Sequence, residues 1–263
     1  MRIAHRRLEY IRPARRRPAR WGRRVAGTIA AGVALAGVSY GVYVVRTWLR
    51  YGQRHAAIPP DSLLDHFLPN PEVRECHETG VAAPAATTYA AALALALDQS
   101  PVVRAIFRGR ELLMGATQRG GPQKTRPFLE QMLAIGWGLL ADVPGRKLVF
   151  GAVTQPWRAD VVFRSLPPEM FANFAEPGYT KIVWTVEVEP LDPVTTVFRT
   201  ETRVSTTDAN ARARFRRYWA FLSPGILLIR RETLRLVKRE AERRAHAERR
   251  AQIERRAQSA HYA

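Results

Sequence analysis

The sequence feature that most constrains the fold is a strand pattern that runs directly into a helical pattern between residues 195 and 238. Side chains in residues 195–204 alternate in polarity, so one face of the predicted strand is dry. After a run of capping residues, apolar positions recur at steps of three and four: Ala211, Phe215, Tyr218, Leu222, Ile226 and Ile229. A helix of about thirty residues is about 45 Å long. It therefore needs a broad apolar partner, which the preceding strands can supply.

The predicted helix contains one interruption, Ser223-Pro224-Gly225. Proline cannot donate to the carbonyl four residues back, so the helix either kinks here or stops and restarts with Ser223 as its cap. Both alternatives bend the helix around a curved sheet.

Basic residues are concentrated at the two ends of the chain. The 263 residues carry a net charge of +19, of which residues 1–24 contribute +9 and residues 230–263 contribute +6. This distribution favours anionic lipid or membrane topology over nucleic acid as the reason for the charge. We therefore expect no nucleic-acid partner, since the central domain has no basic face with interleaved aromatic residues.

Val25–Val45 is the candidate membrane span. These 21 residues carry no charge, and as a helix they would span about 30 Å, the thickness of the hydrocarbon core. Ten arginines precede the span and only three follow closely, which places the N-terminus in the cytoplasm. The expected localisation is a single-pass protein of the bacterial inner membrane.

Two further properties of this segment are open. Arg23-Arg24 and the sequence Ala34-Leu35-Ala36 resemble an export signal with a cleavage site, but the apolar run continues nine residues further than such a signal needs. Gly37 and Gly41 form a small-xxx-small motif that permits a homodimer through the membrane helix, although packing-neutral glycines are common in such helices.

The chain divides into five predicted parts. These are an Arg-rich leader (1–24), the membrane helix (25–45), a connector (46–70), a folded domain (71–240) and a basic tail (241–263), which is helical or disordered and not a coiled coil. Within the domain we expect a strand, two helices, a run of antiparallel strands and the long C-terminal helix. The expected strands cover residues 73–81, 134–143, 147–157, 158–164, 179–189 and 195–204.

Three local details of this arrangement are predicted as well. Ser100-Pro101 has the form of a helix start, and Gly115 ends that helix. If the last two strands pair with their apolar faces on the same side, Glu187 lies opposite or diagonal to Arg199 as a cross-strand ion pair. The apolar residues 63, 64, 67 and 68 of the connector can dock on the domain.

This order of elements resembles the helix-grip fold of the START-like SRPBCC superfamily, an α+β fold in which a curved sheet wraps the last helix. The chain is similar to bacterial SRPBCC proteins with an N-terminal apolar segment. The residues that carry the resemblance are Trp48-Leu-Arg-Tyr-Gly52, Gln155-Pro-Trp157, Phe174-Ala-Glu-Pro-Gly178, Thr200-Glu-Thr-Arg203, and Phe215-Arg-Arg-Tyr-Trp219 with Ser223-Pro-Gly225. These motifs describe no known reaction, so the resemblance implies no catalytic residue.

The resemblance implies that the protein binds a lipid or another apolar small molecule in a cavity. The residues that we expect to line the cavity are Trp157, Trp184, Phe198, Glu201, Arg203, Phe215 and Trp219. The aromatic members could equally fill the cavity as packed core residues. Two alternatives remain: an enzyme of the cyclase or dehydratase kind that uses the same cavity, and a non-catalytic interaction module.

Glu201 and Arg203 distinguish these functions by the face on which they lie. A carboxylate in the cavity must be paired and could anchor a ligand or act as a general acid or base. On the opposite face the same residues would form a solvent-side ladder of ion pairs, and this is the interpretation that we favour.

Metal and cofactor chemistry have little support in the sequence. The segment Glu72–Glu78 contains metal-competent residue types, but along a strand Glu75 and His77 point away from Cys76, so no three converge. The histidines lie mostly in the ends and the connector, which argues against nucleophilic hydrolysis. We expect neither a metal nor a cofactor.

Overall fold

A computed structural model describes residues 20–53, 60–95, 100–115 and 128–261. Most of the predicted leader lies outside these residues. The described residues divide into two units, with the boundary between Val44 and Val45.

Helix α1 (Arg20–Arg50) contains the whole predicted membrane span. Large apolar side chains along it are exposed: Ile29, Val33, Leu35, Val38, Val42 and Val45. The side chains of residues 20–27 and Ala30 lie outside the described part. Among the described residues, none of the helices combines the length and the apolar character that a membrane crossing requires.

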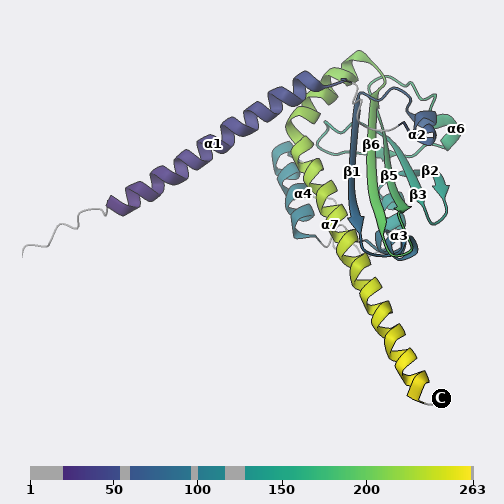
Figure 1. Cartoon of the computed structure of the whole chain (residues 1–263). Helices are drawn as coiled ribbons and strands as arrows, with labels where there is room; N and C mark the ends of the chain where they lie inside the picture. The colour runs from purple at the N-terminus through teal and green to yellow at the C-terminus, as the bar shows by residue number, and fades with distance from the viewer. Residues whose placement is uncertain (1–19, 54–59, 96–99, 116–127, 262–263) are drawn as a thin grey trace, which may run out of the picture. The chain divides into compact units, whose positions relative to one another are not determined.

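The second unit contains one antiparallel sheet with the strand order β1-β6-β5-β3-β2, and β4 pairs with β3 at its end. The strands are β1 (Val73–Val81), β2 (Gly138–Val143), β3 (Lys147–Thr154), β4 (Phe163–Arg164), β5 (Thr180–Pro190) and β6 (Thr196–Thr206). The long C-terminal helix α7 (Ala209–His261) packs on α3, β1 and β6. Figure 1 shows this arrangement. The combination of an antiparallel sheet and a long C-terminal helix fits the predicted helix-grip fold.

In the described part of the chain, five shorter helices connect and cover the strands: α2 (Ser62–Phe67), α3 (Ala85–Leu93), α4 (Pro101–Met114), α5 (Phe128–Ala134) and α6 (Pro168–Phe171). The cap predicted for α4 is confirmed, because the Ser100 hydroxyl accepts a hydrogen bond from the Val103 N–H and Gly115 ends the helix in a left-handed conformation. The strand expected from residue 134 begins only at Gly138, because α5 continues to Ala134 and Gly136 then turns the chain with a φ of 96°.

The β5–β6 hairpin has the predicted register. Glu187 lies directly opposite Arg199. The ion pairs are different from those expected, however. Glu187 binds Lys147 (3.2 Å), whereas Arg199 donates to Glu78 on the other neighbouring strand (2.9 Å). The sequence thus predicted the alignment of the strands but not which acidic side chain forms an ion pair with each basic one.

The sheet has two covered faces. The inner face packs on α3, α5 and α7 with residues such as Phe150, Trp184 and Phe198. The outer face packs on α2 and α6 through Leu64, Phe171 and their neighbours. The predicted docking of the connector on the domain is thereby confirmed.

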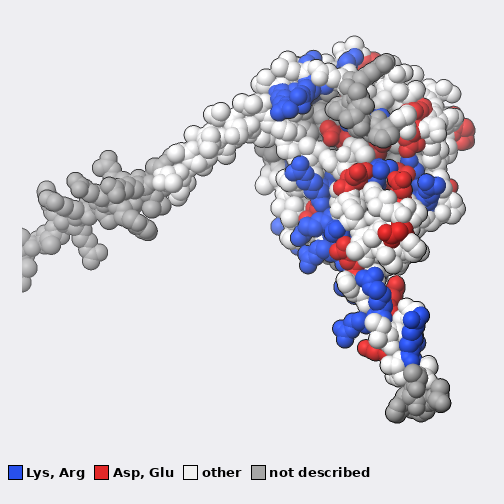
Figure 2. Space-filling view, in the orientation of Figure 1, with Lys and Arg blue, Asp and Glu red and all other residues white. Residues whose placement is uncertain are grey.

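Helix α7 is one helix of 53 residues with Pro224 inside it, so the alternative of a stop and restart is wrong. The helix bends in its first part (Figure 1). Its packed part reaches Ala241 and Ala245, which are fully buried against the domain. Beyond them the predicted basic tail is helical and exposed, with positive and negative side chains along its length (Figure 2).

Candidate functional site

The inner face of the sheet carries a band of polar residues between two apolar clusters. On β6, Phe198 belongs to one cluster and Val204 to the other. The residues between them on the same face are Thr200 and Thr202, and the residues opposite these on β1 are His77 and Glu75. Arg230 of α7 completes the band. We call Glu75, His77, Thr200, Thr202 and Arg230 the polar belt.

Arg230 lies in the stripe of α7 that faces the sheet. Its guanidinium carbon lies 4.1 Å from the centre of the Trp184 ring on β5. The stripe is apolar on both sides, with Ile226 one turn before and Leu234 one turn after. A positive charge at this position is costly to bury, and stacking on the indole face offsets only part of that cost.

Several buried polar atoms at the belt have no hydrogen-bond partner among the described residues. They are Nε of Arg230, Nε1 of Trp184, Oγ1 of Thr200 and Nε2 of His77. Trp184 and Thr200 are themselves 3% and 1% exposed. Because buried polar groups are nearly always satisfied, such a concentration at one place points to a site rather than to ordinary packing.

The edge strand β1 gives access to the belt. The side chains of His77 and Glu75 retain 20% and 31% of their exposure, and Nε2 of His77 lies 3.8 Å from a Glu75 carboxylate oxygen. Burial and the nearby charges of Arg230 and Arg231 lower the pKa of His77. The imidazole is therefore neutral at pH 7, and Arg230 supplies the positive charge of the belt.

The lowered pKa of His77 predicts a loss of stability in mild acid. Between about pH 6.5, the ordinary histidine pKa, and its lower value in the folded protein, the unfolded chain binds more protons, so the free energy of unfolding falls as pH falls. We expect His77→Gln to flatten this dependence between pH 6.5 and 5.5 in denaturant titrations. His246→Gln, on the exposed part of α7, is the matched control and should leave the slope unchanged. Equal slopes for the wild type and His77→Gln would contradict the assignment.

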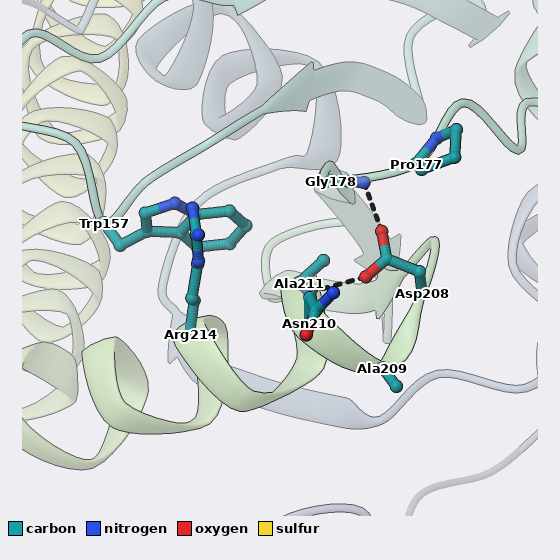
Figure 3. Close-up of a pocket in the computed structure, with 8 residues that line it drawn as sticks. All are labelled: Trp157, Pro177, Gly178, Asp208, Ala209, Asn210, Ala211 and Arg214. Atoms are coloured by element: carbon teal, nitrogen blue, oxygen red, sulfur yellow. Dashed lines mark hydrogen bonds between the residues drawn. The ribbon is translucent and has the colours of Figure 1, made fainter.

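A hollow lies at the start of α7. This open cleft of about 470 Å³ is lined by Trp157, Pro177, Gly178, Asp208, Ala209, Asn210, Ala211 and Arg214 (Figure 3). The Asp208 carboxylate accepts hydrogen bonds from the backbone N–H groups of Ala211 and Gly178, which lowers its pKa. The helix N-terminus is thus already capped by an acid. The cleft combines one base and one acid and has no excess of either charge.

Glu201 and Arg203 lie on the outer face, away from α7. Glu201 accepts hydrogen bonds from Arg74 and from Arg203 (2.7 Å each), and Arg203 also binds Asp65 of α2. Burial opposes the charge of Arg203, but the hydrogen bonds to Glu201 and Asp65 outweigh it and raise the pKa of the guanidinium. Side-chain alternation puts Phe198, Thr200 and Thr202 on the helix side, so Glu201 and Arg203 lie on the face away from α7, and a role for them in ligand binding stays a prediction. The expected solvent-side ladder is wrong, because α2 covers the pair, leaving Glu201 5% and Arg203 1% exposed.

The predicted aromatic residues separate into three places. Trp184 and Phe198 belong to the larger inner cluster, and Phe215 and Trp219 to the smaller one near the start of α7. Trp157 packs at the edge of the smaller cluster and also lines the cleft. Trp184 contacts the polar belt through Arg230. Whether any of them binds a ligand stays a prediction.

Most of the motifs behind the family resemblance meet at one end of the domain. The rings of Tyr51 and Phe215 lie 6.1 Å apart, and the Gln155 side chain donates to the Gly178 carbonyl (2.8 Å). The side chains of residues 200–203 instead alternate between the inner and the outer face of the sheet. The motifs therefore hold the start of α7 against the sheet and the end of α1.

Sequence reasoning missed Arg230 and His77. Arg230 follows Ile226 by four residues and precedes Val237 by seven, a spacing that puts all three on one helix face. The signal was a charge inside an apolar stripe. His77 was placed correctly on one face of its strand, but the sequence does not show that α7 brings a guanidinium to that face.

No protein-family model and no curated protein matches the chain. Among solved structures, a conserved protein from Geobacillus kaustophilus matches with a TM-score of 0.30 at 10% identity, over 65% of this chain and 96% of that one. A hypothetical protein from Helicobacter pylori matches with a TM-score of 0.31 at 9% identity, over 73% and 98%. The Zhui aromatase/cyclase from a Streptomyces species matches with a TM-score of 0.22 at 15% identity, over 65% and 94%. Superpositions this loose carry no functional argument.

Proposed function

We propose that this protein is a membrane-anchored binding protein for a lipid or a similar apolar molecule, held between the inner face of the sheet and α7. The observation that carries the proposal is the polar belt between two apolar clusters. An amphipathic molecule needs both kinds of surface within one site, and the inner face offers them side by side.

The anchor is proposed on the properties of α1. Its described apolar side chains between Ile29 and Val45 are largely exposed, and an extended exposed apolar surface marks a contact with a membrane or a partner. The end of the same helix is fixed to the domain, since Arg216 donates to the Trp48 carbonyl (2.7 Å) and Tyr51 donates to Glu72 (2.5 Å). A tether of this kind keeps the domain close to a reservoir of apolar ligand.

The experiment is to express the full chain, recover it from the membrane fraction, purify it in detergent and identify bound lipid by organic extraction and mass spectrometry. We expect a stoichiometric apolar ligand. Thr200→Phe should remove it by filling the belt, whereas Arg199→Phe, the neighbouring residue on the opposite face, should retain it. A folded chain without ligand, or one in which both variants retain it equally, would contradict the proposal.

An enzyme of the cyclase or dehydratase kind is the second candidate. Glu201 does not support it, because this carboxylate lies on the outer face. The observation in its favour is the His77–Glu75 pair, which places an ionisable pair on the inner face at 3.8 Å. In a binding protein His77→Gln should change at most the amount of ligand bound and not its identity, whereas in an enzyme the variant should accumulate an unconverted ligand of different mass.

A further inference from the structure

The unpartnered groups at the polar belt, together with the indole of Trp184 against which Arg230 stacks, are all able to donate hydrogen bonds. The guanidinium of Arg230 and the indole N–H of Trp184 can only donate, and the Thr200 hydroxyl and the His77 ring can do so. None of these four atoms has an acceptor among the described residues. Donors gathered at one place call for a ligand group that supplies several acceptor atoms.

The electrostatics of the belt favour an acceptor that is negatively charged. In the described part of the chain no carboxylate forms an ion pair with Arg230, and burial alone lowers the pKa of its guanidinium to about 9. It thus remains charged at pH 7. The other charged or titratable groups near it are His77, which is held neutral, the neighbouring Arg231, and Glu75, whose carboxylate lies 3.8 Å from the His77 ring. Arg230 thus carries a positive charge that no ion pair among the described residues neutralises.

The orientation of Arg230 suits an anion as well. The guanidinium lies over the Trp184 ring at 4.1 Å, so the indole occupies one of its faces. The N–H groups point outward from the edge of the guanidinium plane, where a carboxylate or phosphate can bind two of them at once. A hydrocarbon chain would pack against the apolar clusters on either side. The members of these clusters next to the belt are Phe198 on β6 and Ile226 on α7.

We propose that the polar belt is the head-group site for an acidic amphipathic ligand, whose carboxylate or phosphate binds Arg230 with Trp184 and Thr200 as further donors. This inference rests on the proposed binding function and names the ligand class of the same site. The hydrocarbon part packs against the apolar clusters. The head group stays near the accessible edge of β1.

The test compares ligands that differ only in the head group. Radiolabelled palmitic acid, 1-palmitoyl lysophosphatidic acid and hexadecanol are bound at equilibrium to the immobilised full chain in detergent. We expect at least one of the two acids to bind about tenfold or more tightly than the alcohol, the usual gain from a charge-assisted hydrogen bond. The acid that binds more tightly identifies a carboxylate or a phosphate as the natural head group.

Arg230→Gln should remove the preference for acids and leave the affinity for hexadecanol unchanged. Arg231→Gln is the matched control, because it removes an adjacent charge on an exposed side chain, and it should keep the preference. Retention of the preference in Arg230→Gln, or equal binding of acids and alcohol by the wild type, would overturn the inference while the binding function stands. If the wild type binds none of the three ligands, both the inference and the proposed binding function are overturned.

A second variant keeps the site testable if Arg230→Gln does not fold. Thr200→Val preserves the shape of the side chain but removes one donor, so it should weaken acid binding several-fold without affecting hexadecanol. Thermal unfolding of each variant shows whether the fold is intact. If both variants are folded and both bind the acids as tightly as the wild type does, the proposed head-group site is wrong.

Discussion

Replacing Glu201 by leucine is expected to lower the free energy of unfolding by about 3–5 kcal/mol, although the residue lies away from the proposed site. Its carboxylate is shared by two guanidinium groups, those of Arg74 and Arg203, at 2.7 Å each. Without it, two positive charges are left side by side, and Arg203 is only 1% exposed. Denaturant unfolding of the full chain in detergent measures the loss.

The chain contains a matched control for this prediction. Glu240 on α7 is likewise shared by two arginines, Arg243 and Arg244, at 2.7 Å each, but its side chain is 32% exposed. Hydrogen bonds from these arginines, first from Arg243, lower the pKa of Glu240 to about 2. Glu240→Leu should nevertheless cost no more than about 1 kcal/mol, because water screens and solvates the charges left behind.

A double variant tests whether the stability lost in Glu201→Leu comes from the buried charge that it leaves on Arg203. Glu201→Leu combined with Arg203→Met replaces the buried charges by apolar groups of similar size. Such replacements are often neutral, so the double variant should recover most of the stability lost in Glu201→Leu. Equal losses for Glu201→Leu and Glu240→Leu, or no recovery in the double variant, would show that burial under α2 does not determine the energetics of this network.

Phe215→Ala is expected to lower the free energy of unfolding by about 3–5 kcal/mol, as for other buried phenylalanines. Phe215 is 1% exposed, and its ring lies 6.1 Å from Tyr51, 5.9 Å from Tyr218 and 5.9 Å from Trp219. The truncation leaves a cavity that these large rings cannot close. The variant also loosens the contact between the end of α1 and the domain.

Phe221→Ala on the same helix is the control, because Phe221 is 52% exposed and exposed substitutions change stability by about 0.5 kcal/mol. The comparison also tests the sequence prediction that Phe215 lines a ligand cavity. As a packed core residue it should affect stability and leave the choice between acid and alcohol ligands unchanged. A small stability loss with altered ligand preference would support the original prediction instead.

Local patterns in the sequence predicted much of the domain. Val73–Val81 alternates as a strand and Ser100-Pro101 caps a helix, and both appear as predicted. The hairpin register that places Glu187 opposite Arg199 also follows from neighbouring residues, because side-chain period and turn length are local quantities. The helix α5 (Phe128–Ala134) was missed because its seven residues are too few to show a clear helical period, and they lead directly into residues expected to form a strand.

The placement of the functional groups depended on contacts between distant residues. Glu201 is buried because Asp65 and Leu68, more than 130 positions earlier, bring α2 over the outer face. His77, Thr200 and Arg230 form one belt only because β1 pairs with β6 and α7 crosses both. The sequence by itself determined which side chains share a face of each strand and helix, since that follows from backbone periodicity. Only the tertiary structure decided what each face meets, because packing partners far apart in the chain set burial and charge.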